Sequence, residues 1–218
     1  MRPIQRSPLS RPALDFLAKR TARVSQAPSP AAEAKRLWPL KENKAFTEIC
    51  DLLGNMASGL SRCMYCEDNE GTDIDHFHPK ATYPALAFTW TNYLLACSHC
   101  NSNEKRDQFP VDASGAPLLL DPTAEDPFTH LDFVPDTGMF DARTMKGSES
   151  RRVFGLDRQT LQDGRRLAWV ALLTLLEGYQ RAKDAGDGEP AQKLAEVVRQ
   201  TWRPATGRPS FRATAWAS

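Results

Sequence analysis

The 218-residue sequence has no hydrophobic run long enough to span a bilayer. Its longest apolar stretch, Ala168-Trp-Val-Ala-Leu-Leu, falls far short of the roughly 20 residues that a transmembrane helix needs. Residues 1–20 also lack the apolar segment of a secretory signal and carry prolines and basic side chains instead. These absences predict a cytoplasmic protein that does not contact membranes.

Cysteine and histidine are scarce, with 5 and 4 residues, yet most of them lie within one short stretch. Two pairs, Cys63-Met-Tyr-Cys66 and Cys97-Ser-His-Cys100, frame that stretch. A reducing compartment excludes a disulfide framework and favours metal binding by such pairs. Four thiolates complete the tetrahedron that zinc prefers and leave no open position for water. We therefore expect a structural zinc ion; reduced core cysteines are the alternative.

The fifth cysteine, Cys50, belongs to a different pattern. Apolar residues recur every three or four positions between residues 43 and 58, which predicts a helix with one apolar face. That face consists of Phe46, Ile49, Cys50, Leu53 and Met56. We therefore expect the Cys50 thiol to pack in the core.

The net charge of +1 is close to zero, but its distribution is uneven. Residues 1–48 contain 10 basic and 4 acidic side chains, whereas residues 62–75 are predominantly acidic. A basic arm beside an acidic patch suits a protein that holds a polyanion and a divalent cation together. A merely solvated arm is the alternative for the basic segment taken alone.

The periodic segments predict an α+β fold that is mainly helical. Helices are expected at residues 11–23, 32–38, 43–58, 158–185 and 190–202, a strand at 72–77, and a short helix at 101–107. The other segments are an extended arm at 1–10, a linker at 24–31, turns and short strands over 110–150, and a loose tail at 203–218. We expect three parts: an arm with helices at 1–60, a zinc-containing core at 61–110, and a loop-rich wrap at 111–218 whose C-terminal helices pack on the core.

Polar residues suited to metal binding and acid–base chemistry lie between and beside the cysteine pairs. Asp75 and His76 are adjacent, so on a strand their side chains point to opposite faces. The Asp75 carboxylate suits Mg²⁺ or Mn²⁺, and a neutral imidazole at His76 suits a general base. Asn101 directly follows the last cysteine and offers a second oxygen ligand. Lys105 lies one helical turn further and could neutralise a phosphate. Taken singly, these residues have alternatives: a surface Asp-His pair, a capping or turn residue at Asn92 or Asn101, and a solvated Lys105.

The order Cys-x-x-Cys, Asp-His-x-x-Pro, Asn, Cys-x-x-Cys-Asn, Lys resembles the zinc-containing HNH endonucleases of the ββα-metal (His-Me finger) class. The three letters fall on His76, Asn92 and Asn101, so Asn stands where the name has a second His. The flanking sequences resemble the retron-associated and Septu PtuB-type HNH proteins of bacterial anti-phage defence. His78 is a departure, because Arg is more usual at that position.

The resemblance implies a metal-dependent endonuclease whose substrate is a nucleic acid, with DNA expected. His76 would be the general base, Asp75 and Asn101 would hold the catalytic Mg²⁺ or Mn²⁺, and Asn92 would orient the loop that carries His76. His78, Lys80 and Lys105 would contact the nucleic acid, and an ATPase subunit of a defence complex would be the partner. A zinc-stapled binding module without catalysis is the alternative.

Basic side chains outside the cysteine region are further candidates for binding the nucleic-acid backbone. They are Arg151, Arg152, Arg158, Arg165 and Arg166. A solvated helix face is the alternative interpretation of this group.

Overall fold

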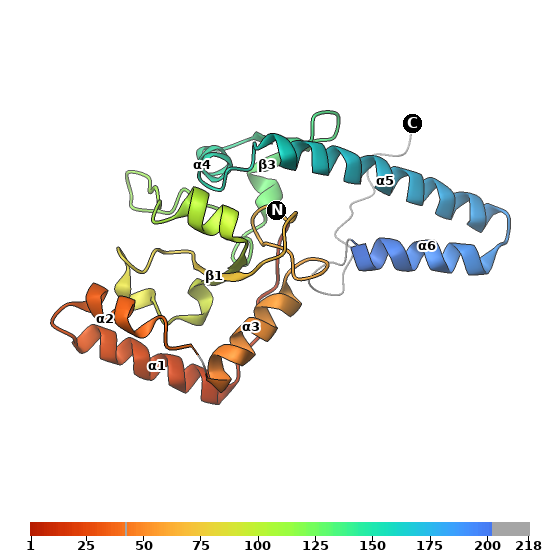
Figure 1. Ribbon diagram of the computed structural model, residues 1–218. Helices are drawn as coiled ribbons and strands as arrows, with labels where there is room; N and C mark the ends of the chain where they lie inside the picture. Colours follow the sequence, from red (N-terminus) through yellow and green to blue (C-terminus); the bar gives the residue numbers. More distant parts are fainter. Residues whose placement is uncertain (42, 202–218) are drawn as a thin grey trace.

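The protein, described here from a computed structural model, is mainly helical with two small β-hairpins; residues 1–41 and 43–201 are described (Figure 1). The elements are α1 (Arg11–Gln26), α2 (Pro30–Leu37), α3 (Lys44–Met56), β1 (Asp73–His76), η1 (Pro84–Leu86), η2 (Trp90–Asn92), β2 (Tyr93–Ala96), η3 (His99–Lys105), η4 (Pro127–Thr129), β3 (Leu131–Val134), β4 (Met139–Ala142), α4 (Met145–Val153), α5 (Gln159–Asp184) and α6 (Gly188–Thr201). The expected α+β, mainly helical class is confirmed. The tail expected at 203–218 lies outside the described residues.

The N-terminal helices begin at capping residues that the sequence supplies. The Ser10 hydroxyl accepts a hydrogen bond from Ala13 N at 3.3 Å, and the Asn43 side chain accepts one from Phe46 N at 3.2 Å. Helix α1 continues to Gln26, into the segment expected as a linker, because Val24 is completely buried and extends the apolar face by one turn. The linker is therefore shorter than the sequence predicted.

Helix α3 buries Phe46, Ile49, Leu53 and Met56, whereas Cys50 is exposed. The expectation that Cys50 packs in the core is therefore wrong. The buried residues are spaced at three and four positions, so the centre of the apolar face passes through Ile49 and leaves the next residue at its edge.

Strands β1 and β2 form an antiparallel hairpin in which Asp75 pairs with Leu94 and His76 pairs with Tyr93. The short helix η3 follows β2 directly, so the segment has the order strand, strand, helix. Because successive side chains of a strand alternate, Asp75 and His76 point to opposite faces, as expected. The hairpin therefore divides the candidate site into two sides.

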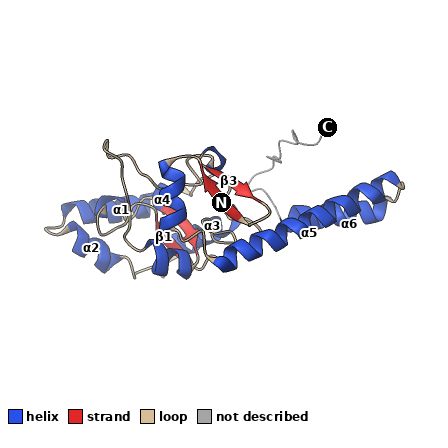
Figure 2. Cartoon of the chain, turned by 90° about the horizontal axis from the view of Figure 1, so that it is seen from above, coloured by secondary structure: helices blue, strands red, loops and turns tan. Residues whose placement is uncertain are grey.

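The segment after η3 packs around the β1–β2 hairpin, and α5 and α6 then extend away from the rest of the molecule (Figures 1 and 2). Phe154 and Leu156, which follow α4, are completely buried. Helix α5 is anchored by buried Leu161 and by a contact of Trp169 with Phe133, whose ring centroids lie 5.8 Å apart. Beyond that anchor α5 packs against α6, and the pair extends away from the core. Among the described helices, none is long and apolar enough to cross a membrane.

Ile49 and Cys50, neighbours in α3, provide a test of how this helix packs on the core. We expect Ile49→Ala to lower the free energy of unfolding by about 2–5 kcal/mol, because it removes a completely buried side chain. Cys50→Ser should change it by less than about 0.5 kcal/mol, because the thiol is exposed. Urea denaturation followed by circular dichroism measures both. Equal effects would contradict the described orientation of α3.

Candidate functional site

The four cysteines of the two pairs come together as the sequence predicted. Their sulfur atoms all lie within 4.8 Å of one another, and the residues are buried. The Cys66 and Cys97 sulfurs are 4.0 Å apart. A tetrahedral zinc ion with Zn–S bonds of about 2.3 Å separates its thiolates by about 3.8 Å, so the spacing and the chemistry of this donor set fit zinc. With all four positions taken by sulfur, such an ion has a structural role.

Neighbouring N–H groups point at the sulfurs. Arg158 Nη2 donates to Cys100 Sγ at 3.6 Å, and Asn69 Nδ2 donates to Cys97 Sγ at 3.8 Å. Such donors stabilise the negative charge of a four-thiolate centre. Arg158 also lies 3.6 Å from the Glu104 carboxylate. The guanidinium therefore faces the cysteine cluster in this structure, in contrast to the nucleic-acid contact for which it was a candidate.

A metal analysis tests the cluster directly. We expect one zinc ion per chain in the wild type, and loss of both zinc and folded structure in Cys97→Ser, because a structural zinc contributes folding free energy. Cys50→Ser is the matched control and should keep its zinc. Elemental analysis together with thermal unfolding measures both properties. A zinc-free wild-type protein with an unchanged fold would contradict the assignment.

On one side of β1, the Asp75 carboxylate belongs to a buried network. The Tyr65 hydroxyl donates to Asp75 Oδ2, and Lys105 Nζ lies 3.2 Å from Asp75 Oδ1. Lys105 Nζ also donates to His76 O at 2.7 Å. Burial is the main reason that the pKa of Tyr65 is raised, so the phenol stays protonated and remains a donor. Its ring stacks on Phe154 at 3.9 Å between centroids. The network thus joins the first cysteine pair, β1, η3 and the segment after α4.

The network changes the interpretation of two expected site residues. The Lys105 side chain has 0% of its surface exposed, so the phosphate contact expected of it is not available in this structure. Asn101 Nδ2 donates to Asp73 Oδ2 at 3.1 Å, so η3 lies along β1 with Asn101 beside Asp73 and Lys105 beside Asp75. Asp73 and Asp75 share one face of the strand, because they are two residues apart. Asp73 is therefore an oxygen donor of the site that the sequence analysis did not single out.

The buried ion pair can be tested through stability. We expect Lys105→Met to cost about 3–5 kcal/mol of unfolding free energy, because it leaves the Asp75 carboxylate buried without its cation. The double variant Asp75→Asn/Lys105→Met should recover part of that loss, because it removes the uncompensated charge. Urea denaturation of the single and double variants measures the coupling. Additive losses would show that the two charges do not interact.

On the other side of β1, His76 lies in an aromatic setting. His76 Nε2 is 2.9 Å from the carbonyl oxygen of Ala87, to which Tyr93 also donates its hydroxyl at 2.8 Å. The Trp38 ring centroid is 4.1 Å from that of His76. Burial, with the charges of nearby lysines in the same direction, lowers the pKa of His76 to about 3. The imidazole is therefore neutral at physiological pH. Trp38 and the Ala87 carbonyl carry no motif and were missed by the sequence analysis.

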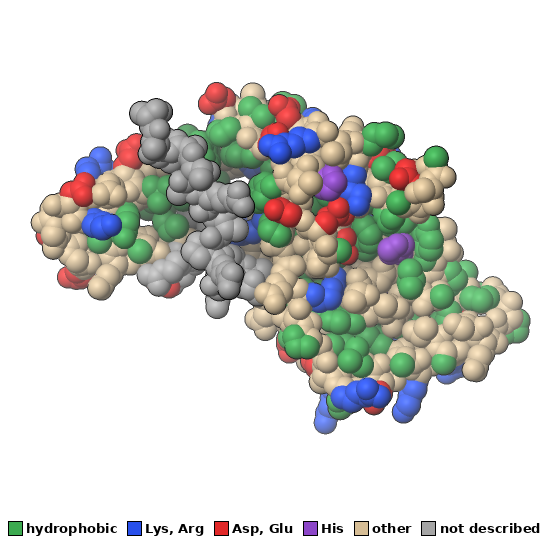
Figure 3. All heavy atoms as spheres, turned by 180° about the vertical axis from the view of Figure 1, so that it is seen from behind, with side chains coloured by type: hydrophobic (Ala, Val, Ile, Leu, Met, Phe, Trp, Pro, Cys, Tyr) green, Lys and Arg blue, Asp and Glu red, His purple; other side chains and the backbone are tan. Residues whose placement is uncertain are grey.

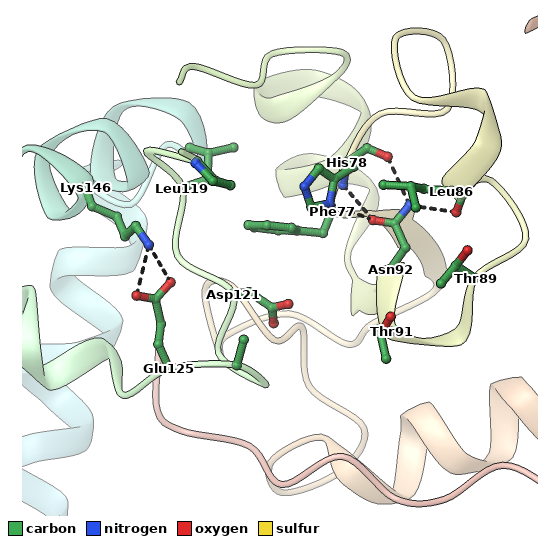
Figure 4. A pocket seen from close by; sticks show the side chains of 12 residues that line it. Phe77, His78, Leu86, Thr89, Thr91, Asn92, Leu119, Asp121, Glu125 and Lys146 are labelled. Carbon is green, nitrogen blue, oxygen red and sulfur yellow. Dashed lines mark hydrogen bonds and ion pairs between the residues drawn. The ribbon is translucent and has the colours of Figure 1, made fainter. Parts of the chain in front are cut away.

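Asn92 holds together the loop between the two strands, as shown in Figure 4. Its Oδ1 accepts from His78 N at 2.7 Å, and its Nδ2 donates to the carbonyl oxygens of His78 and Leu86, both at 3.0 Å. Every hydrogen-bonding atom of the buried amide is thereby used. These bonds restrain the loop that carries Ala87, and so the orientation of His76. The loop-orienting role expected of Asn92 stays a prediction.

His78 lies beside a pocket of about 330 Å³ that Asn92 and Phe77 also line (Figure 4). Its Nδ1 is 3.3 Å from Asn92 Oδ1, and burial is the main reason that its pKa is lowered. The Glu125 carboxylate in the same lining is paired with Lys146 at 2.9 Å. His78 is therefore a neutral, partly exposed imidazole near the site and not a fixed charge.

The arginines proposed for backbone binding have internal partners. Arg151 pairs with Asp157, Arg152 with Glu149, Arg166 with Asp163, and Arg165 donates to the carbonyl oxygens of Gly138 and Leu156. Figure 3 shows acidic and basic side chains interspersed on the rear face, not gathered into a field of one sign. These arginines are therefore engaged with other groups of the protein.

Comparison with known proteins agrees with this site. Residues 63–107 match the HNH endonuclease family. The chain is 34% identical to Septu protein PtuB of Bacillus mycoides (strain KBAB4), over 54% of this chain and 49% of that protein. It is 32% identical to Septu protein PtuB of Bacillus thuringiensis, over 33% and 28% of the two chains. Protein ea31 of Escherichia phage lambda is 37% identical over 33% of this chain and 24% of that protein.

These matches confirm the resemblance to HNH endonucleases and to the Septu PtuB-type proteins. The matched residues 63–107 contain both cysteine pairs and every candidate site residue from Asp75 to Lys105. The chain spans about half the length of the first of these relatives and less of the other two. The function proposed below therefore rests on the segment that matches the HNH family, residues 63–107.

Proposed function

We propose that the protein is a metal-dependent HNH endonuclease that hydrolyses phosphodiester bonds in nucleic acid, with DNA as the expected substrate. The observation that carries the proposal is the setting of His76: a neutral imidazole in an HNH segment, fixed by one ring nitrogen. A general base needs an unprotonated nitrogen held in one orientation. The Ala87 carbonyl can only accept, so the hydrogen bond at 2.9 Å requires that Nε2 carry the proton.

This tautomer leaves Nδ1 of His76 unprotonated and able to take a proton from water. Within the described part of the chain, the His76 ring makes its hydrogen bond to Ala87 O through Nε2. Asn92 keeps that carbonyl in place through its bonds to His78 and Leu86. Asn92 is thus a positioning residue, and His76 is the group that accepts the proton when water attacks the phosphorus.

Oxygen donors next to His76 in sequence and in η3 would hold the divalent ion. Asp75, Asn101 and also Asp73 offer carboxylate and amide oxygens of the kind that Mg²⁺ and Mn²⁺ prefer. When bound, such an ion would stabilise negative charge on the phosphate and the leaving oxygen. Asp75 now contacts both Tyr65 and Lys105. In this proposal Lys105 acts on Asp75, orienting the carboxylate, and not on the nucleic acid.

Lys80 and His78 are the proposed contacts of the HNH segment with the nucleic-acid backbone. Both are partly exposed and lie in the turn after β1. Similarity to the Septu PtuB proteins supports a role as a nuclease effector in anti-phage defence. We propose that an ATPase subunit is the partner and that the protein acts in the cytoplasm, where its thiolates stay reduced. The retron association suggested by the flanking sequences stays a prediction.

A cleavage assay tests the proposal. We expect the wild type to nick supercoiled plasmid with Mg²⁺ or Mn²⁺, with its ATPase partner and nucleotide present. His76→Ala should reduce the rate by about 10²–10⁴-fold, because it removes the general base. His130→Gln, a histidine outside the HNH segment, is the matched control and should retain activity. Circular dichroism verifies that each variant is folded.

The opposite outcome supports the alternative function. A protein that binds nucleic acid and never cleaves it would indicate a zinc-stapled binding module. A His76→Ala variant that cleaves as fast as the wild type would contradict the assignment of His76 as the general base. Cleavage that disappears in all variants, including the His130→Gln control, would point to loss of folded protein and not to loss of a catalytic group.

A further inference from the structure

The aromatic ring that packs on His76 belongs to Trp38, a residue outside the HNH segment. Trp38 follows α2 directly, and its ring centroid lies 4.1 Å from that of His76, with the planes inclined by 57°. The indole is held by three other rings: its centroid is 5.7 Å from Phe46, 6.1 Å from Phe88 and 5.7 Å from Tyr93. Trp38 is therefore a fixed part of the candidate nuclease site.

Two ammonium groups converge on this indole. Lys41 Nζ lies 4.6 Å from the Trp38 ring centroid, and Lys80 Nζ lies 6.0 Å from it. Lys41 comes from the segment between α2 and α3, whereas Lys80 comes from the turn after β1. Both side chains are partly exposed. Neither has a carboxylate within ion-pair distance among residues 1–41 and 43–201.

Two like charges at one ring repel each other, and a cation–π contact at a partly exposed site offsets that repulsion only modestly. Both ammonium groups lie within 6.0 Å of the same ring centroid, so an anion that binds beside this ring is attracted to both lysines and offsets their repulsion. The anion would then also lie against the ring that covers His76. A phosphate oxygen of a polynucleotide has the charge and the accessibility that this place requires.

We propose that Lys41 and Lys80, which both contact the Trp38 ring, bind the phosphodiester backbone beside His76. We call these three residues the clamp. The proposal rests on the proposed nuclease function and adds Lys41 and Trp38, residues outside the matched segment, to its substrate-binding site. The clamp binds phosphate and not bases, so it holds nucleic acid without regard to sequence. The N-terminal helices thereby complete a site that the HNH segment alone leaves open.

The test is the salt dependence of DNA binding by the full chain, measured with a fluorescent duplex in the non-cleaving His76→Ala background. Lys41→Gln and Lys80→Gln should each weaken binding at low salt and lower the slope of log K against log salt by about 1. Lys41→Arg should restore the slope, because it keeps the charge. Lys35→Gln removes an exposed charge from α2 and should leave the slope unchanged.

The outcomes separate the clamp from the nuclease activity. With His76 present, the clamp variants should raise KM for a cleaved oligonucleotide more than they lower kcat. Slopes equal to that of Lys35→Gln would overturn the clamp and leave the nuclease function standing. A slope change without cleavage by any version of the protein would uphold the clamp and overturn the nuclease function. A full chain that binds no duplex at low salt would overturn both.

Discussion

Four thiol groups within 4.8 Å of one another, buried from water, are the constraint on which the site depends. Such a group of sulfurs cannot ionise together unless a cation binds them, and zinc supplies that cation with a matching geometry. Tyr65 lies inside the first cysteine pair and bonds to Asp75, while the second pair leads directly into η3. Joining the two pairs therefore also brings Asn101 and Lys105 of η3 beside β1, the strand that carries Asp75.

The hairpin that results has two chemically different sides. One side of β1 is a charged interior in which Lys105 balances Asp75. The other side is aromatic, and burial there keeps His76 neutral. Placing the carboxylate and the imidazole on opposite faces lets one strand carry two groups whose environments differ. The proposed roles, with Asp75 as a metal ligand and His76 as the proton acceptor at the same phosphate, use these two environments.

Much of this could be predicted from the sequence, because spacing determines local geometry. The paired cysteines indicate the cluster, and adjacency places Asp75 and His76 on opposite faces. The burial of Lys105 could not be predicted, since its spacing from Asn101 gives the helix face but not what that face packs against. Trp38 and Lys41 were missed because they reach His76 only through tertiary packing. Cys50 was misplaced because periodicity fixes the edge of an apolar face only to within one residue.

The central claim is that the zinc is a closed scaffold and that the chemistry takes place on β1. X-ray absorption at the zinc edge tests it most directly, with the full-length protein measured alone and with a bound oligonucleotide. The account predicts four sulfur ligands at about 2.3 Å in both states, with no light-atom ligand. An oxygen or nitrogen ligand at zinc, or a change of its ligands when the oligonucleotide binds, would place the reaction at zinc and contradict the account.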